Sequence, residues 1–445
     1  MFKKLYFKLE ILKHHFKKNL ILILILLFIS GLSFIFRQQL ISFFQLKILR
    51  TKYIGISGLY TPSNLPPEIK NLISTGLTTN GEKNKPIISD IVEHYFTEND
   101  NQDYIFKIKE DIFWHDGKRL TAYDIDYPLP GLQVTPVDQL TFKITTQTPF
   151  APFLAYLNEP LFKNKLVGIG PYKVNKTIYR DGYIKQLNLK PLDSSKEKII
   201  YRFYSSDRDL ITAYKLGEVD EITINLLTEE IKTWHQTDIK ASVETDKKYL
   251  ALFINTEKIN NKQLRQAIAY ATPKTKDKNE RCIGPISPLS WAYNPQIKEY
   301  EFDPARSKTL AEDNLIISEI KLSISSPDLL KKAEEIKSSW QEILNIKTDI
   351  VIENRINQDN YDIILSYGGI PTDPDQYHFW HSTQMETNLT KINNSRIDKL
   401  LEEGRQTFDL QKRKEIYLEF QKYLLEESPV IFLSYPTTYF ISRVK

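Results

Sequence analysis

Hydrophobic and polar residues follow different periods in the two halves of the chain. In the first half, residues 104–109 and 140–145 alternate between apolar and polar side chains, as half-buried strands do. In the second half, the apolar residues of 328–344 recur at helical spacing. Residues 361–367 form a nearly continuous apolar run, typical of a strand covered on both faces. The pattern predicts an α/β protein with a more β-rich stretch inserted early, whose large lobes would face each other across a cleft.

The same periods predict further elements along the chain. Strands are expected at 184–189, 199–204, 249–254, 349–353 and 430–435, and helices at 207–216, 262–271, 395–403 and 409–426. No internal repeat is visible in the sequence, and no linker rich in Gly, Ser or Pro divides it into independent domains.

An apolar run without charges covers residues 20–36, with lysines before it and Arg37 after it. Its length is at the short end of what crosses a hydrocarbon core of about 30 Å. No cysteine follows the run as a lipoprotein would require, and the small residues Ser30, Gly31 and Ser33 lie inside it, where they make a poor cleavage site. We therefore expect a retained anchor, with a cleaved signal peptide as the alternative.

The distribution of charge supports this topology. The 445 residues carry a net charge of +4, but six lysines against one glutamate in residues 1–19 leave the remainder slightly negative. This lysine cluster predicts a cytoplasmic N-terminus, with everything after about residue 40 on the extracellular or periplasmic side of the cell membrane. Without a basic patch in the bulk of the chain, nucleic acid is not an expected partner.

Composition and motifs exclude several classes of chemistry. With 26% charged and 41% hydrophobic residues the chain is globular, and its length allows two to four domains. Its one cysteine, Cys282, excludes a disulfide framework and is expected to be an ordinary thiol. The pair His378 and His381 could belong to a metal site, but the aromatic residues between them favour a cleft wall. Because no nucleophile, phosphate-binding or zinc motif occurs, we expect a protein that is not an enzyme and holds no metal or cofactor.

A series of segments in fixed order resembles the family 5 extracellular solute-binding proteins, the oligopeptide- and dipeptide-binding components of ABC importers. The most specific is 112–125, IFWHDGKRLTAYDI, in which Asp116-Gly117 is expected to form a tight turn and Thr121 to cap a helix with Asp124. The others are 86–95, 104–109, 167–173, 249–256, 264–271, 287–295, 303–308, 361–365 and 372–377.

The resemblance implies a two-lobed periplasmic-binding-protein fold of the hinge-closing type II, with a small β-rich inserted subdomain and one preceding transmembrane helix. The expected division is a cytoplasmic segment 1–19, a transmembrane helix 20–36, lobe I from 50–72, 166–245 and 428–445, the insert 73–165, and lobe II 246–427. The family usually adds a C-terminal segment that returns to the first lobe. We expect this segment to be missing, which would leave the second lobe trimmed and the cleft more open.

The resemblance also implies a ligand site between the lobes, where aromatic rings offer stacking area and glycines allow close approach. The candidate residues are Tyr367, Gly368, Gly369, Ile370, Asp373 and Asp375, with Trp291, Tyr293 and Asn294 opposite them. In peptide-binding members an aspartate that pairs with the ligand's amino group stands where this chain has Ile370. Either Asp373 or Asp375 substitutes for it, or the ligand has no free amine, and we favour the second reading because a buried unpaired cation is costly.

These features predict a membrane-anchored solute-binding protein of an ABC importer. It would be a monomer whose partners are a peptide-like or other small solute, the permease subunits and, through the N-terminal helix, the membrane. The main alternative is a solute-binding fold that serves as a sensor or surface interaction protein without transport. A surface hydrolase is a third possibility, opposed by the absence of catalytic motifs.

Overall fold

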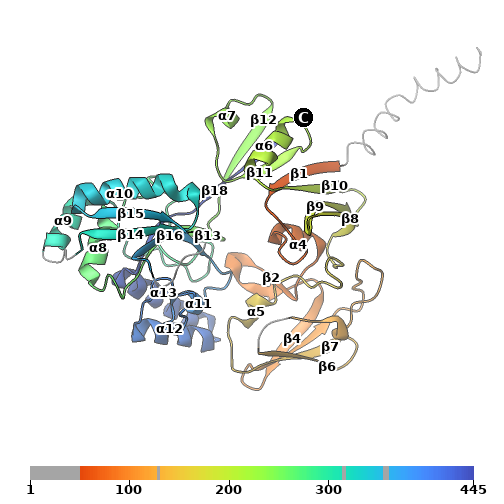
Figure 1. The fold of residues 1–445 in the computed structure, drawn as a ribbon. Coiled ribbons are helices and arrows are strands. Elements are labelled where there is room, and N and C mark those ends of the chain that lie inside the picture. The colour runs from red at the N-terminus through yellow and green to blue at the C-terminus, as the bar shows by residue number, and fades with distance from the viewer. Residues whose placement is uncertain (1–50, 128–130, 313–316, 354–359, 445) are drawn as a thin grey trace, which may run out of the picture.

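The structure, a computed structural model, describes residues 51–127, 131–312, 317–353 and 360–444. The described residues form two lobes, each built on a large sheet, and an insert (Figure 1). We call these parts the first lobe, the second lobe and the insert. The content is mixed α/β, as the residue pattern predicted. Among the described residues no helix has the length and apolar character needed to cross a bilayer, and the predicted span at 20–36 lies outside them.

The first lobe holds a seven-stranded sheet flanked by short helices. Its strands run in the order β12 (Thr237–Val243), β18 (Thr437–Arg443), β11 (Glu221–Ile224), β1 (Thr51–Ser57), β10 (Lys198–Tyr204), β9 (Tyr183–Pro191) and β8 (Tyr172–Arg180). Its helices are α4 (Pro67–Ile73), α6 (Asp207–Lys215) and α7 (Glu229–Lys232). Helix α6 begins at the cap Ser206 and is followed by Gly217 at φ +76°, close to the boundaries that the sequence predicted.

The insert holds a four-stranded antiparallel sheet and a small hairpin. The sheet order is β4 (Val92–Glu98), β5 (Asp103–Ile108), β7 (Thr141–Thr146) and β6 (Leu132–Pro136), and the hairpin pairs β2 (Thr78–Asn80) with β3 (Pro86–Ile88). Two short helices follow the 3-10 turn η1 (Glu82–Asn84), namely η2 (Ala122–Asp124) and α5 (Phe153–Tyr156). The expected cap is present, since Asp124 accepts a hydrogen bond from the Thr121 backbone N–H at 2.9 Å.

The second lobe holds a five-stranded sheet covered by helices. The order is β15 (Lys347–Ile352), β14 (Glu319–Ile324), β16 (Ile363–Gly369), β13 (Lys248–Ile254) and β17 (Val430–Ser434). The helical elements are α8 (Lys262–Ala271), α9 (Pro304–Glu312), η3 (Pro327–Leu329), α10 (Leu330–Leu344), α11 (Tyr377–Trp380), α12 (Ser395–Gln406) and α13 (Leu410–Glu427). Strand β13 is buried over most of its length and β16 over its first three residues, Ile363 to Leu365, which explains their apolar sequence.

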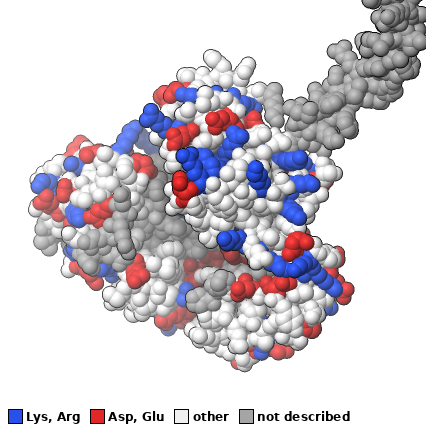
Figure 2. Space-filling model, turned by 45° about the vertical axis from the view of Figure 1, so that its right-hand side comes forward, with Lys and Arg blue, Asp and Glu red and all other residues white. Residues whose placement is uncertain are grey.

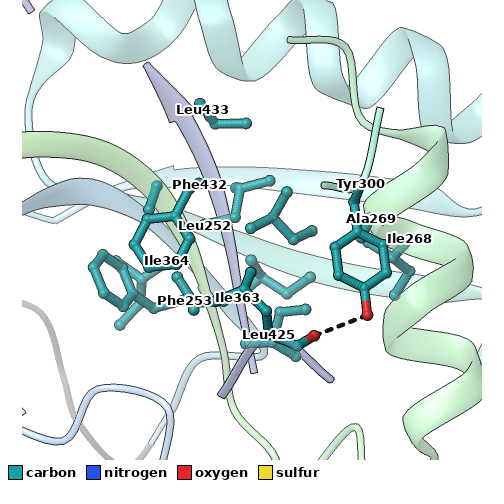
Figure 3. Packing of buried hydrophobic residues seen from close by; sticks show 14 of the residues in the cluster. Leu252, Phe253, Ile268, Ala269, Tyr300, Ile363, Ile364, Leu425, Phe432 and Leu433 are labelled. Atoms are coloured by element: carbon teal, nitrogen blue, oxygen red, sulfur yellow. Dashed lines mark hydrogen bonds between the residues drawn. The ribbon is translucent and has the colours of Figure 1, made fainter. Parts of the chain in front are cut away.

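Each of the three parts has a separate hydrophobic core. In the second lobe, side chains of β13, β16 and β17 pack between the helices, and the Tyr300 hydroxyl donates to the Leu425 carbonyl at 2.8 Å (Figure 3). The insert has its own cluster around Phe106 and Phe142. Separate cores allow these parts to move as rigid bodies about the segments that join them.

The C-terminal segment differs from the sequence expectation. Val430–Ser434 is an edge strand of the second lobe, paired with β13, so it does not belong with lobe I in the range 428–445. After Tyr435 and Pro436 the chain returns to the first lobe, where β18 lies between β12 and β11. Strand β18 thus forms the return to the first lobe that was expected to be missing, although the range assigned to lobe I already included its residues.

Candidate functional site

A cavity of about 520 Å³ lies between the two lobes, and we call it the interlobe cavity. The second lobe contributes the loop that follows β16, and the other wall comes from α4 and from α5 with the turn after it. The lining residues are Pro67, Lys70, Asn71, Ala155, Tyr156, Asn158, Glu159, Pro160, Pro371, Thr372, Asp373 and Asp375. Of the nine predicted site residues, Asp373 and Asp375 therefore line this cavity.

The loop after β16 is held in place by its own aspartates. The Asp373 carboxylate accepts a hydrogen bond from the Asp375 backbone N–H at 3.0 Å, and the Asp375 carboxylate accepts one from the Tyr377 N–H at 3.1 Å. Such side-chain turns replace backbone pairing where a loop leaves a sheet. The loop therefore stands as a rigid edge of the cavity.

Both aspartates are neutralised by arginines of their own lobe. The buried Arg413 guanidinium binds both oxygens of Asp373, one of them at 2.8 Å, and its Nε donates to the Gly404 carbonyl. Arg405 binds Asp375 through two nitrogens at 2.9–3.2 Å. Burial raises the pKa of Asp373, and the charge of Arg413 opposes that rise. Burial alone would lower the pKa of Arg413, but the Asp373 carboxylate raises it above the ordinary value.

The remaining charges of the interlobe cavity are also paired. Lys70 on α4 lies 2.5 Å from the Glu159 carboxylate. All four charged residues that line this cavity thus have an oppositely charged partner within the protein. The wall can offer hydrogen bonds and apolar contact, but none of these four charges is free to neutralise a ligand ion.

The four predicted residues that precede the loop have other surroundings. Tyr367 is half-buried, with the Lys248 ammonium 4.5 Å from its ring centre, and burial raises its pKa. Gly368 lies against the ring of Tyr249, and Ile370 belongs to the core of the second lobe with only 9% of its surface exposed. These residues, with the exposed Gly369, position the loop, and the structure does not place them among the residues that line the cavity.

The three residues predicted to stand opposite belong to the same lobe as the loop. Trp291 is buried beside Arg413, with the guanidinium 5.4 Å from its ring centre. Asn294 donates to the Leu418 carbonyl of α13, and Tyr293 lines a separate cavity of about 960 Å³. The opposing wall comes instead from α4 and α5, whose ordinary sequence carries no signal of a ligand site.

A second cavity of about 570 Å³ lies between the insert and the second lobe, and we call it the insert cavity. It is lined mainly by aromatic and apolar side chains. They are Lys85, Pro86, Tyr95, Phe96, Thr97, Asn101, Tyr104, Ala151, Leu154, Trp291, Phe408, Leu410 and Arg413. Because Asp373 lines one cavity and its partner Arg413 the other, this ion pair lies between the two cavities.

Hydrogen bonds and an ion pair join the second lobe to the rest of the molecule. The backbone N–H of Ala151 donates to the Arg405 carbonyl at 2.7 Å, and the backbone N–H of Trp291 donates to the Lys83 carbonyl at 3.1 Å. Lys247, in the segment that joins β12 of the first lobe to β13 of the second, lies 2.6 Å from Glu68 of α4. Desolvation alone would raise the pKa of Glu68, but the hydrogen bond and charge of Lys247 lower it.

The candidate metal and nucleophile residues have structural partners. His381 Nδ1 lies 2.8 Å from the Thr383 hydroxyl and its Nε2 lies 3.2 Å from Glu402. Over the described ranges, His, Cys, Asp and Glu form no group of three or more suited to a metal ion. Cys282 is fully buried, and burial raises its pKa to about 12, so the thiol stays protonated at neutral pH.

Comparison with known proteins identifies the family. The sequence model for bacterial extracellular solute-binding proteins, family 5 middle, matches residues 126–388. The oligopeptide-binding protein AppA of Bacillus subtilis is 23% identical over 465 residues, which cover 86% of this chain and 84% of that protein. The dipeptide-binding protein of Escherichia coli is 20% identical over 446 residues, covering 79% and 82% of the two chains.

Solved structures show the same fold. NikZ from Campylobacter jejuni, in complex with Ni(L-His), has a TM-score of 0.72 at 21% identity and covers 88% of this chain and 94% of its own. NikA from Brucella suis, in complex with Fe(III)-EDTA, has a TM-score of 0.73 at 18% identity, covering 88% and 95%. The resemblance found in the sequence is confirmed: this chain belongs to family 5 of the bacterial extracellular solute-binding proteins.

Proposed function

We propose that this chain is the membrane-anchored, extracellular solute-binding component of an ABC importer and that it acts without catalysing a reaction. A peptide-like or other small solute would be held between the lobes and presented to the permease. The observation that carries this proposal is the interlobe cavity, whose walls come from both sides of the hinge. Closure requires only that the solute bind the closed state better, and about 1.4 kcal/mol of preference shifts the equilibrium tenfold.

The paired charges favour a solute without a free amino group. A buried ammonium needs a carboxylate at hydrogen-bonding distance, and both aspartates of the loop are already bound to arginines. Ile370 packs in the core of the second lobe and offers no charge. This arrangement supports the absent-amine reading over the reading in which Asp373 or Asp375 substitutes as the anchor.

The test is a titration of the full chain with matched ligands. Tryptophan fluorescence and thermal shift would be followed with free-amine peptides, their N-acetylated forms, sugars and metal chelates. We expect uncharged or N-acetylated ligands to raise the melting temperature more than free-amine peptides do. If no ligand class shifts either signal, solute binding is rejected and the sensor or interaction role becomes the better account.

A substitution in the cavity wall tests the charge argument directly. Thr372 lines the interlobe cavity and is only partly buried, so Thr372→Asp adds a carboxylate without an arginine partner. We expect this variant to gain at least about tenfold in affinity for free-amine peptides, since a charge-assisted hydrogen bond contributes about 1.5–3 kcal/mol. Thr372→Asn, which is similar in size and neutral, is the control. Equal affinities of the two variants would contradict the argument.

The proposed anchor is tested separately by fractionation. The full chain should stay with membranes after a carbonate wash, and a variant lacking residues 1–36 should not. Release of the full chain by carbonate would argue for a cleaved or peripheral N-terminus.

A further inference from the structure

The outer face of β8 and β9, on the first lobe, is left exposed by the residues that the structure describes. The inner face of these strands buries Leu187 and Leu189 in the core of the lobe. On the other side of the sheet, α6 packs on β1, β10 and β11. Lys176, Lys185 and Lys190 are all exposed on β8 and β9, so we call this surface the basic sheet face.

This face and the adjoining strand are strongly cationic. Residues 172–204 contain eight Lys or Arg against three Asp or Glu, a net charge of +5, although residues 20–445 as a whole carry a net charge of −1. Opposite residues of an antiparallel pair share a face, so Lys173 and Lys190 lie on the same face, where the Lys173 ammonium also donates to the His115 carbonyl at 2.5 Å. Figure 2 shows Lys and Arg side chains close together on this lobe. Like charges so close together favour a polyanionic partner.

The tip of the β8–β9 hairpin adds apolar and aromatic surface. Ile178, Tyr179 and Tyr183 expose 38%, 49% and 40% of their surfaces, and Arg180 lies between the two tyrosines. Tyrosine prefers the boundary between water and lipid because its ring is apolar and its hydroxyl is polar. A basic face that ends in exposed tyrosines has the composition of a surface that binds at the headgroup level of a bilayer.

The chain enters the first lobe beside this surface. Thr51, the first described residue, is paired with Lys198 of β10. Fourteen residues separate it from the end of the predicted span at Phe36. A fully extended segment of that length reaches at most about 50 Å, so an inserted span would keep the first lobe near the bilayer. At such a distance the local concentration of headgroups is high, and weak contacts become effective.

We propose that the basic sheet face rests on the anionic phospholipid headgroups of the membrane that holds the chain. The proposal rests on the proposed anchor, which would keep the first lobe near the bilayer. The match between the basic sheet face and anionic headgroups does not depend on that anchor. The contact holds the first lobe against the bilayer, so that closure is carried out by the second lobe.

The test uses the full chain in vesicles of 30% phosphatidylglycerol or of phosphatidylcholine alone, with a quencher attached to the headgroups. Asn175→Cys places a fluorophore on exposed β8, since the native Cys282 is fully buried. We expect quenching at least threefold stronger on the anionic vesicles, reversed by 0.5 M salt while the chain stays in the membrane fraction.

A charge-reversal variant and a matched control complete the test. Replacing Lys176, Arg180 and Lys190 with Glu should abolish the quenching. Lys331, Lys337 and Lys399 of the second lobe, replaced with Glu in the same background, should leave it unchanged. Equal quenching on the two vesicle types, or none on the anionic ones, would overturn the proposal. Carbonate extraction of the same samples tests the anchor separately. A chain that carbonate releases lacks the anchor, whereas a chain that stays in the membrane without quenching lacks the contact of the basic sheet face.

Discussion

At the scale of single residues, the ion pair of Asp373 and Arg413 determines the chemistry of the interlobe cavity. Both side chains are 5% exposed, and the guanidinium binds both carboxylate oxygens. The sequence identified Asp373 as a site residue, because it stands in a loop that resembles the family's. It did not reveal Arg413, which lies forty residues later on α13, since nothing in a helical period marks one arginine as the partner of a distant aspartate.

Removal of this arginine should destabilise the protein strongly. Arg413→Met leaves a buried carboxylate without its partner, at a cost of about 3–5 kcal/mol in the free energy of unfolding at pH 7. Without Arg413, burial raises the pKa of Asp373 further above its unfolded value, so the folded state binds the proton more tightly. The deficit relative to wild type should therefore shrink as the pH is lowered. Urea denaturation at several pH values measures this.

Arg405→Met is the matched control for this prediction. Arg405 is more exposed than Arg413, so loss of its pair with Asp375 should cost less. The double change Asp373→Asn with Arg413→Met should recover part of the lost stability. A deficit that stays constant with pH would contradict the proposed role of the carboxylate.

At the scale of elements, strand β16 shows which features follow from the sequence pattern and which follow from packing against neighbouring strands. Its buried apolar run predicted a central strand, and the structure places it between β13 and β14. Gly368 and Gly369 were predicted to admit a ligand. Gly368 instead gives room to the ring of Tyr249 on the neighbouring strand, a contact that only the pairing of β13 with β16 creates.

The two glycines should therefore respond differently to alanine. A Cβ at position 368 would lie 2.5 Å from the buried Tyr249 ring, so we expect Gly368→Ala to lower the free energy of unfolding by about 1–3 kcal/mol. At position 369 the nearest atom would be 3.9 Å away, on Phe379, and Gly369→Ala should change stability by less than about 0.5 kcal/mol. Thermal and urea unfolding of both variants measure the difference. Equal losses would contradict the packing role of Gly368.

At the scale of the whole molecule, two chain crossings join the lobes and lie side by side. The crossing after β12 and the crossing after β17 are linked by the Glu244 N–H, which donates to the Pro436 carbonyl at 2.9 Å. Lys247 follows directly and reaches both Glu244 and Glu68. Because the Glu68 pair links the two lobes, it would stabilise the closed arrangement in the proposed closure.

Loss of the pair between Lys247 and Glu68 should favour opening. Glu68→Gln is expected to shift the open–closed equilibrium by no more than about fivefold, since exposed ion pairs contribute little. The pKa of Glu68 is lowered by Lys247, so the pair is intact above the ordinary range of glutamate and is lost as the pH falls through the lowered pKa. Distances between spin labels on the two lobes should therefore lengthen in the variant and in wild type at acid pH.

A second exposed pair provides the control for this prediction. Lys347 and Glu319 lie 2.8 Å apart within the second lobe, so Glu319→Gln removes a similar pair that does not span the hinge. It should leave the label distances unchanged. Equal lengthening in both variants would show that the effect comes from charge in general.

The sequence by itself determined the family, the α/β class, eight of the described strands, the longer helices α6, α8, α10, α12 and α13, and the loop that carries Asp373 and Asp375. These features depend on local periodicity and on ordered motifs, which are present before the chain folds. Only the tertiary structure decided that the two aspartates are neutralised, that Gly368 serves packing, that α4 and α5 form the opposing wall, and that β17 belongs to the second lobe. Each of these depends on contacts between residues far apart in the chain, whose geometry no local period contains.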